Sequence, residues 1–194
     1  MNKLDKILNR ACKKCKEYWS QYPSVEESWN NCGRGDWMLW LSFNMGISLQ
    51  ELTLAKGRIA KTVVHLMTDE RSKKAVEVAI AFGRGEATLE ELNAAKVAAY
   101  IVAVAHVGYY FASFDAYSQA KDAANQAANA CVDFCKIYDV AIYAARAVAA
   151  DAYDIYHDAD SARKKSLQNS AKICREVLTE TVFKRLAELR EEEI

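Results

Sequence analysis

Alanine dominates the middle of this chain, where 21 of the 59 residues from Ala94 to Ala152 are alanine. These alanines recur three and four residues apart, the spacing that places side chains on one face of an α-helix. Alanine has the highest helix propensity, and its side chain buries no polar atom. The stretch therefore predicts long, closely packed helices. It also offers few groups able to transfer protons, attack carbonyls or bind metal ions.

The composition is that of a globular all-α protein. A chain of 194 residues, 52% hydrophobic and 27% charged, is long enough for one domain with a sizeable core. Its single proline and seven glycines are too few for the many tight turns of a β-sandwich or barrel. Twenty-six basic residues balance twenty-six acidic residues, so we expect neither a nucleic-acid partner nor an anionic membrane partner.

We predict a single helical domain over residues 1–194, a multi-helix bundle with long Ala/Tyr-rich C-terminal helices. Its parts are N-terminal helices (1–31), a corner with short helices (32–87), Ala-rich helices (88–183) and a charged tail (184–194) that we expect to fray. No uninterrupted apolar segment of a secretory signal follows the N-terminal charges. This predicts a cytoplasmic protein whose six cysteines are reduced.

Capping residues and glycines predict the helix boundaries. We expect a first helix from Asn2 to about Trp19, and further helices opened by Ser24, Asp36, Ser48, Thr68 or Asp69, and Thr88. The helix opened by Ser48 should run to about Met67, Gly46 should adopt a left-handed conformation, and Gly83 or Gly85 should end a helix. Beyond Gly108 one unbroken helix would exceed roughly 120 Å, so we predict breaks at 113–115, 125–129 and 157–161, the last with Asp160 or Ser161 as a cap.

The uncharged stretch from Val97 to Phe114 has two interpretations. At about 18 residues it reaches the lower limit for a membrane-spanning helix. A helix that is apolar on all sides can equally be the central helix of a bundle. We favour the buried helix, because His106 and Gly108 lie within the stretch and Asp115 follows it.

The most distinctive local segment is Arg34-Gly35-Asp36-Trp37-Met38-Leu39-Trp40-Leu41. Trp37 and Trp40 are three residues apart and share a helix face, Asp36 suits a helix cap, and Arg34 can form a bidentate pair with a carboxylate. The segment is either a structural corner or a binding site for a partner or ligand, because Trp and Arg dominate interface hot spots.

Three further cations, Arg58, Lys61 and Arg71, could border a cleft together with Arg34. The alternative interpretation is that they are ordinary surface charges. We retain Arg58 and Lys61 as candidate binding residues beside the Arg34 segment.

The remaining reactive side chains form no recognisable site. Cys12 with Cys15, and Cys131 with Cys135, have helical spacings that could supply zinc ligands, but neither pair lies on a tight turn, so we interpret them as core thiols. The histidines at 65, 106 and 157 lie on separate predicted helices without ligand spacing.

An acidic face formed by Asp151, Asp154, Asp158 and Asp160 resembles the carboxylate pattern of metal-binding bundles, but it lacks the Glu-x-x-His motif, so we interpret it as solvated. Phosphate loops, dinucleotide fingerprints and hydrolase elbows are also missing from the sequence. We therefore predict no catalytic residues, no metal site and no cofactor.

Several short segments in combination resemble a known family. They are Cys32-x-Arg34-Gly35-Asp36-Trp37, Leu52-x-Leu54-Ala55, Phe82-x-Arg84-Gly85-Glu86 and Ser170-Ala-Lys-Ile-Cys-Arg175. From about Cys32 to Leu178 the chain resembles bacterial and phage proteins described as immunity proteins, specifically the immunity-five-like domain. The resemblance implies binding and neutralisation of a toxin rather than catalysis. It makes Arg34, Asp36, Trp37 and Trp40 the first place to look for a partner surface.

We therefore expect a non-enzymatic protein that neutralises a toxin or a bacterial defence factor by binding it. The alternative is a phage or mobile-element protein that sequesters a small molecule such as a nucleotide signal, since an aromatic crevice beside Arg34, Arg58 or Lys61 would suit an aromatic anion. A metal-dependent enzyme built on the carboxylates of residues 151–160 ranks last. A homo-oligomer is compatible with each of these hypotheses.

Overall fold

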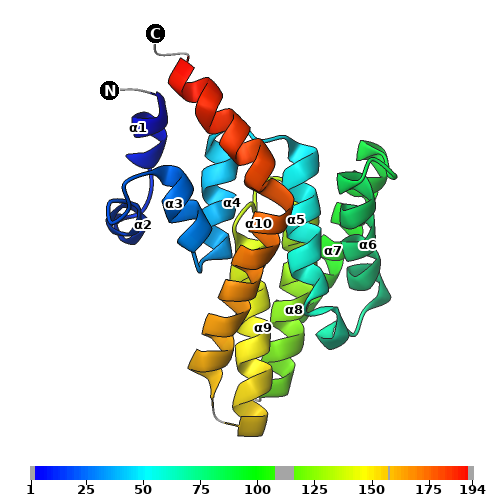
Figure 1. Ribbon diagram of the computed structural model, residues 1–194. Coiled ribbons are helices and arrows are strands. Elements are labelled where there is room, and N and C mark those ends of the chain that lie inside the picture. Colours follow the sequence, from blue (N-terminus) through cyan, green and yellow to red (C-terminus); the bar gives the residue numbers. More distant parts are fainter. Residues whose placement is uncertain (1–2, 108–115, 157, 192–194) are drawn as a thin grey trace.

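The structure of the chain is a computed structural model that describes residues 3–107, 116–156 and 158–191, and the side chains of these residues except 106, 107, 116, 117 and 153–156. The described residues form ten α-helices and one 3₁₀ helix, and none of them lies in a strand (Figure 1). The predicted all-α bundle is therefore confirmed. The helices are α1 (Lys3–Leu8), α2 (Lys13–Trp19), α3 (Val25–Asn31), α4 (Gly35–Asn44), α5 (Leu49–Lys61), η1 (Val64–Leu66), α6 (Glu70–Gly83), α7 (Leu89–Val107), α8 (Ala116–Val132), α9 (Asp139–Tyr156) and α10 (Ala159–Glu191).

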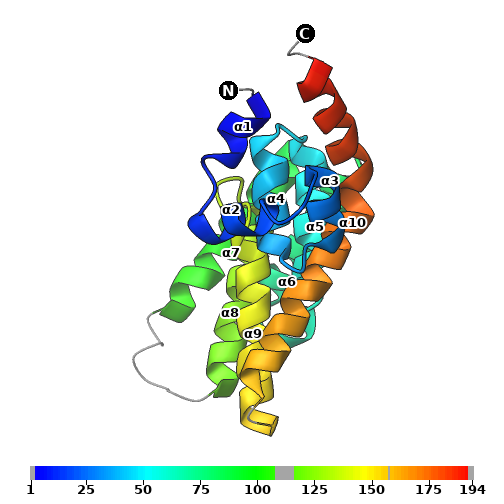
Figure 2. The ribbon, with the colours of Figure 1, turned by 60° about the vertical axis from the view of Figure 1, so that its left-hand side comes forward.

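The long C-terminal helices form the frame of the bundle. Helices α8 and α9 lie side by side, and α10 packs against α9, α4 and α5 as it runs the length of the molecule (Figures 1 and 2). On one side of this frame α5 packs against α6, and α6 packs against α7. The short helices α1–α3 lie on the other side, next to α4 (Figure 1). This arrangement places the Arg34 segment, at the start of α4, against the middle of α10.

Buried alanines occur along both α8 and α9. The side chains of Ala124, Ala127 and Ala128 on α8, and of Ala141 and Ala144 on α9, have no exposed surface. Of all helix pairs in the described ranges, α8 and α9 share the most extensive contact. Methyl-sized side chains let two helix backbones approach closely, and the burial of these alanines agrees with that expectation.

We expect Ala144→Leu to lower the free energy of unfolding by about 1–3 kcal/mol, because three extra carbon atoms must enter a position with no exposed surface. Chemical denaturation followed by circular dichroism measures the change. Ala149→Leu is the control, since Ala149 lies on the same helix and is only partly buried, and its effect should stay within about 0.5 kcal/mol. Equal losses in both variants would contradict tight packing around Ala144.

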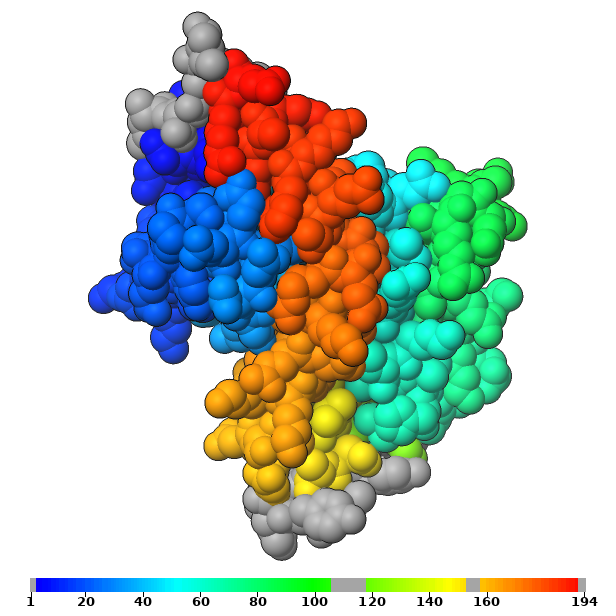
Figure 3. All heavy atoms as spheres, in the orientation of Figure 1, coloured from blue at the N-terminus to red at the C-terminus, as the bar shows by residue number. Residues whose placement is uncertain are grey.

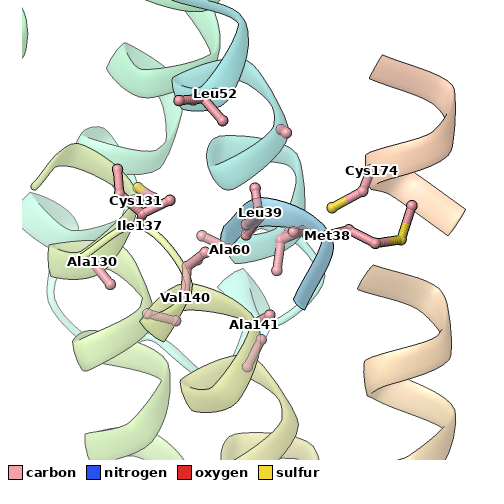
Figure 4. Packing of buried hydrophobic residues seen from close by; sticks show 14 of the residues in the cluster. Met38, Leu39, Leu52, Ala60, Ala130, Cys131, Ile137, Val140, Ala141 and Cys174 are labelled. Atoms are coloured by element: carbon pink, nitrogen blue, oxygen red, sulfur yellow. The ribbon is translucent and has the colours of Figure 1, made fainter. Parts of the chain in front are cut away.

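Residues of α4, α5, α8, α9 and α10 meet in the part of the hydrophobic core that Figure 4 shows. Its labelled members are Met38 and Leu39 of α4, Leu52 and Ala60 of α5, Ala130 and Cys131 of α8, Val140 and Ala141 of α9, Cys174 of α10, and Ile137 in the α8–α9 connection. The core therefore joins the N-terminal half of the chain to the alanine-rich half.

Most predicted helix starts are confirmed. Ser24, Ser48 and Asp69 each accept a hydrogen bond from the backbone N–H of a residue two or three positions later. Thr88 and Glu91 form the expected reciprocal capping box. Gly46 has a φ of 83°, the left-handed conformation expected there.

Two helices are shorter than predicted. The expected helix from Asn2 to Trp19 is broken between Leu8 and Lys13, where Cys12 caps the start of α2. The helix opened by Ser48 ends at Lys61 instead of Met67, and a 3₁₀ turn follows it. In both places the chain bends to bring buried side chains, Ala11 and Val63, into the core.

The predicted break at 125–129 is wrong, because these residues lie inside α8 and the chain turns at 133–138 instead. Asp160 and Ser161 are not caps: α10 begins at Ala159, and the N–H of Ala162 donates to the carbonyl of Asp158. The break predicted at 113–115 and the histidine at 157 lie outside the described residues.

The charged tail does not fray before Glu191, where α10 ends. Leu186 and Leu189 are fully buried, and the Arg185 guanidinium donates to the carbonyl of Met45. The apolar residues of this segment are spaced so that one face packs against the bundle, while the charges occupy the other side.

The uncharged stretch after Val97 is only partly a core helix. On α7, Ala99 and Val102 are buried, but Val97 is 60% exposed and Ile101 is 50% exposed. Within the described ranges, every helix is too short or too polar to cross a membrane. The remainder of the stretch, beyond Val107, falls outside the described part of the chain.

Candidate functional site

The Arg34 segment forms a compact cluster at the start of α4. The Arg34 guanidinium makes two parallel hydrogen bonds to the Asp36 carboxylate, Nε to Oδ1 at 2.8 Å and Nη2 to Oδ2 at 2.6 Å. The same guanidinium lies 4.6 Å from the centre of the Trp37 ring. The side chain of Arg34 is 39% exposed, whereas that of Asp36 is 6% exposed. The predicted pairing of Arg34 with a carboxylate is thus present, and its partner is two residues away.

The prediction that Asp36 caps the helix is wrong. Helix α4 begins at Gly35, Arg34 occupies the cap position without a side-chain cap bond, and Asp36 lies in the first turn. Its carboxylate is engaged by the arginine. The bidentate pair with the guanidinium gives this carboxylate two charge-assisted hydrogen bonds, whereas a cap would give it one.

Aromatic side chains from α2 hold this cluster on its other side. The rings of Tyr18 and Trp37 lie 5.6 Å apart, and those of Trp19 and Trp40 stack at 5.9 Å. The Tyr18 hydroxyl donates to the carbonyl of Ser28. Trp37 and Trp40 are both only partly buried. Each tryptophan of α4 is therefore fixed by an aromatic partner, and each keeps some surface accessible to solvent.

The loop before α4 is tied directly to α10. The Arg175 guanidinium donates to the carbonyl of Cys32 at 2.6 Å, and the Cys174 thiol donates to the carbonyl of Gly35. A Cβ atom at Gly35 would lie 2.5 Å from Cβ of Ser170. Only a glycine therefore lets the start of α4 approach α10 this closely.

A surface pocket of about 350 Å³ adjoins Arg34. It lies between the loop before α4 and the first turns of α10, which reach the surface below the N-terminal helices in Figure 3. The lining residues are Gly33, Arg34, Asp160, Arg163, Lys164, Leu167 and Gln168. Three cations and one carboxylate line the pocket, so its chemistry favours an anionic group.

The six candidate binding residues separate into two sets. Arg34, Asp36 and Trp37 contact one another, and Trp40 follows one turn later. Arg58 and Lys61 lie in the last turn of α5 and are absent from the lining of the Arg34 pocket. Arg71 pairs with Asp69 next to it. None of these three cations lines the Arg34 pocket.

Sequence reasoning missed the residues of α10 that complete the site. Arg163 and Lys164 stand in an unremarkable charged run, and only the packing of α10 against the Arg34 loop brings them to the pocket. The sequence does not indicate that these two segments meet, because more than a hundred residues separate them.

Lys56 is a second feature that was missed. Its side chain has no exposed surface, and its ammonium donates to the carbonyl of Asp133 at 2.6 Å. Burial lowers the Lys56 pKa to about 8. The sequence signal was available, since Lys56 lies four residues after Leu52 and three before Ile59, both buried core residues. Its contact indicates a structural role in anchoring the α8–α9 connection.

The cysteines differ in their burial, and the other possible metal ligands form no cluster among the described residues. The cysteines at 15, 32, 131 and 174 are buried, as core thiols should be, but Cys12 and Cys135 are exposed, which corrects that interpretation. Among described residues no three His, Cys, Asp or Glu side chains come together to hold a metal ion. The side chains of Asp154 and His106 fall outside the described set.

Comparisons with protein-family models, with curated proteins and with solved structures returned no match for this chain.

Proposed function

We propose that this protein acts in the cytoplasm by binding and neutralising another protein, a toxin or a bacterial defence factor. The observation that supports this is the fixed cluster of Arg34, Trp37 and Trp40, partly exposed at the surface beside a cationic pocket. Arginine and tryptophan dominate protein interface hot spots. Side chains already held in one conformation lose little entropy on binding. The resemblance to immunity-five-like proteins gives the same expectation.

The partner surface that fits this corner is an acidic segment. Arg163 and Lys164 line the pocket, and no ion pair to either is found among the described residues. A carboxylate from a partner could therefore pair with them without displacing Asp36 from Arg34. An aspartate or glutamate in the pocket would also lie near the Arg34 guanidinium, which packs on the Trp37 ring.

Charge reversal on α10 tests this proposal. We expect Lys164→Glu to weaken capture of a partner from bacterial lysate by about tenfold or more, because it places a negative charge where the partner is acidic. Lys165→Glu is the matched control: Lys165 is the next residue, is exposed and does not line the pocket. The captured protein is then purified and mixed with each variant, and complex formation and inhibition of its activity are measured.

Two results would contradict the proposal. One is the absence of any stoichiometric partner. The other is loss of capture on Ile101→Glu, on the exposed apolar face of α7, while Lys164→Glu binds normally, since this would place the partner surface elsewhere.

The pocket volume also favours a second function, sequestration of a small anion such as a nucleotide signal. About 350 Å³ lies within the range of small-molecule sites. A thermal-shift screen with nucleoside phosphates and cyclic dinucleotides tests it. A ligand at a hundred times its Kd should stabilise the wild type by about 2.7 kcal/mol. Lys164→Glu should lose that shift, and Lys165→Glu should keep it. No shift with any nucleotide would exclude this function.

A further inference from the structure

Cys12 and Cys15 form a close pair of thiols at the outer edge of the molecule. The two Sγ atoms lie 3.0 Å apart. The N–H of Cys15 also donates to Sγ of Cys12, at 3.4 Å. The pair belongs to α2 and the residue before it, and α2 lies at the periphery of the bundle in Figure 1. Two sulfur atoms this close need only a small rotation to form a bond.

The two thiols differ in accessibility. Cys12 is exposed, whereas Cys15 is 4% exposed. The hydrogen bond between the two thiols lowers the pKa of Cys12, and the backbone N–H of Cys15 and the charge of Arg34 contribute. Burial raises the pKa of Cys15. An exposed thiol with a lowered pKa next to a buried thiol is the arrangement of a nucleophilic and a resolving cysteine.

The other interpretations of this pair fit the structure less well. A zinc site needs further ligands, and the described side chains supply no third one. A core thiol would be buried, as Cys131 is. Cys131 is fully buried, and its thiol donates to the carbonyl of Ala128, as expected of a structural cysteine.

We propose that Cys12 and Cys15 are a redox-active dithiol that exchanges two electrons with low-molecular-weight anionic disulfides. Lys13 and Lys14, both exposed, lie between the two cysteines and favour an anionic substrate such as glutathione disulfide. This activity does not rest on the proposed partner binding.

The reaction has two exchange steps. The Cys12 thiolate attacks one sulfur of glutathione disulfide, forms a mixed disulfide and releases one glutathione thiolate. Cys15 then loses its proton to water, and its sulfur attacks Sγ of Cys12, which releases the second glutathione. The protein loses two electrons and gains the Cys12–Cys15 bond, while the glutathione disulfide takes up these electrons and two protons to become two thiols.

The experiment uses the full-length reduced protein in glutathione buffers of graded oxidation, followed by acid quenching, alkylation of free thiols and peptide mass mapping. The wild type should form the Cys12–Cys15 disulfide with little mixed disulfide. Cys15→Ala should instead accumulate one glutathione on Cys12, because no resolving thiol remains. Cys12→Ser should leave Cys15 unmodified. A Cys131→Ser/Cys135→Ser variant, which removes the other closely spaced pair, should behave like the wild type.

Three outcomes would overturn the proposal. They are a stable mixed disulfide on Cys12 in the wild type, modification of Cys135 in preference to Cys12, and no Cys12–Cys15 peptide at any glutathione ratio. The wild-type peptide map decides the question even if Cys15→Ala fails to fold, which circular dichroism would detect.

Discussion

Gly35→Ala is expected to lower the free energy of unfolding by about 3 kcal/mol or more. The added Cβ would lie 2.5 Å from Cβ of Ser170, 2.7 Å from its carbonyl carbon and 2.9 Å from the backbone nitrogen of Ala171. Two of these three atoms belong to the backbone of α10, so no rotamer change can relieve the overlap. Helix α4 and α10 must move apart.

Gly33→Ala provides the control two residues away. There an added Cβ would lie 3.6 Å from the side chain of Gln168, an ordinary contact, and the change should stay within about 0.5 kcal/mol. Thermal unfolding followed by circular dichroism compares the two variants, and about 3 kcal/mol corresponds to a Tm lower by roughly 10 °C. A Gly35→Ala protein as stable as Gly33→Ala would show that α4 and α10 are not packed this closely.

Lys56→Met should change the pH dependence of stability. Burial lowers the Lys56 pKa from its ordinary value of 10.5 to about 8. Below pH 8 the ammonium is present in both the folded and the unfolded chain, and the folded chain carries its full desolvation cost. Between pH 8 and 10.5 the unfolded chain holds a proton that the folded chain has lost, so the free energy of unfolding rises with pH.

The methionine side chain does not titrate, so the free energy of unfolding of the variant lacks this rise with pH. We therefore expect the wild type to gain on the order of 2 kcal/mol relative to Lys56→Met between pH 7 and pH 9.5. Urea denaturation of both proteins across this range measures the difference, and the titrations that both share cancel. Lys61→Met, which removes an exposed lysine from the same helix, should differ from the wild type by a constant amount. If the stability difference between the wild type and Lys56→Met also stayed constant with pH, Lys56 would not be buried as a cation.

The expectations that succeeded depend on neighbours in the sequence. Ser24, Ser48 and Thr88 cap helices because each hydroxyl meets an N–H three residues later, a relation that any sequence reader can see. Asp36 is also a residue type that caps helices, yet its carboxylate accepts hydrogen bonds from Arg34 instead. From the sequence, Asp36 could bind either a backbone N–H or the Arg34 guanidinium. The position of Arg34 in the folded protein determines that the guanidinium is its partner.

In the candidate site, too, contacts between sequence neighbours could be predicted and contacts between distant segments could not. The Arg34–Trp37 contact was within reach of sequence reasoning because the two residues share one turn. Arg58 and Lys61 were grouped with Arg34 by charge alone, and the structure places them on another helix end. Conversely, Arg163 and Lys164 reach the pocket only because α10 crosses the Arg34 loop. The spacing of Cys12 and Cys15 is visible in the sequence, but the exposure of one and burial of the other is not.

By itself the sequence determined the all-α class, most helix starts and the close packing of the alanine-rich helices, because helix propensity, capping and side-chain size act over a few residues. The sequence also predicted the boundary between α9 and α10, within 157–161. Only the tertiary structure decided where the chain turns between α8 and α9, which cations line one pocket and which thiols are exposed. These depend on contacts between segments far apart in the chain, where the burial of apolar faces outweighs local preference.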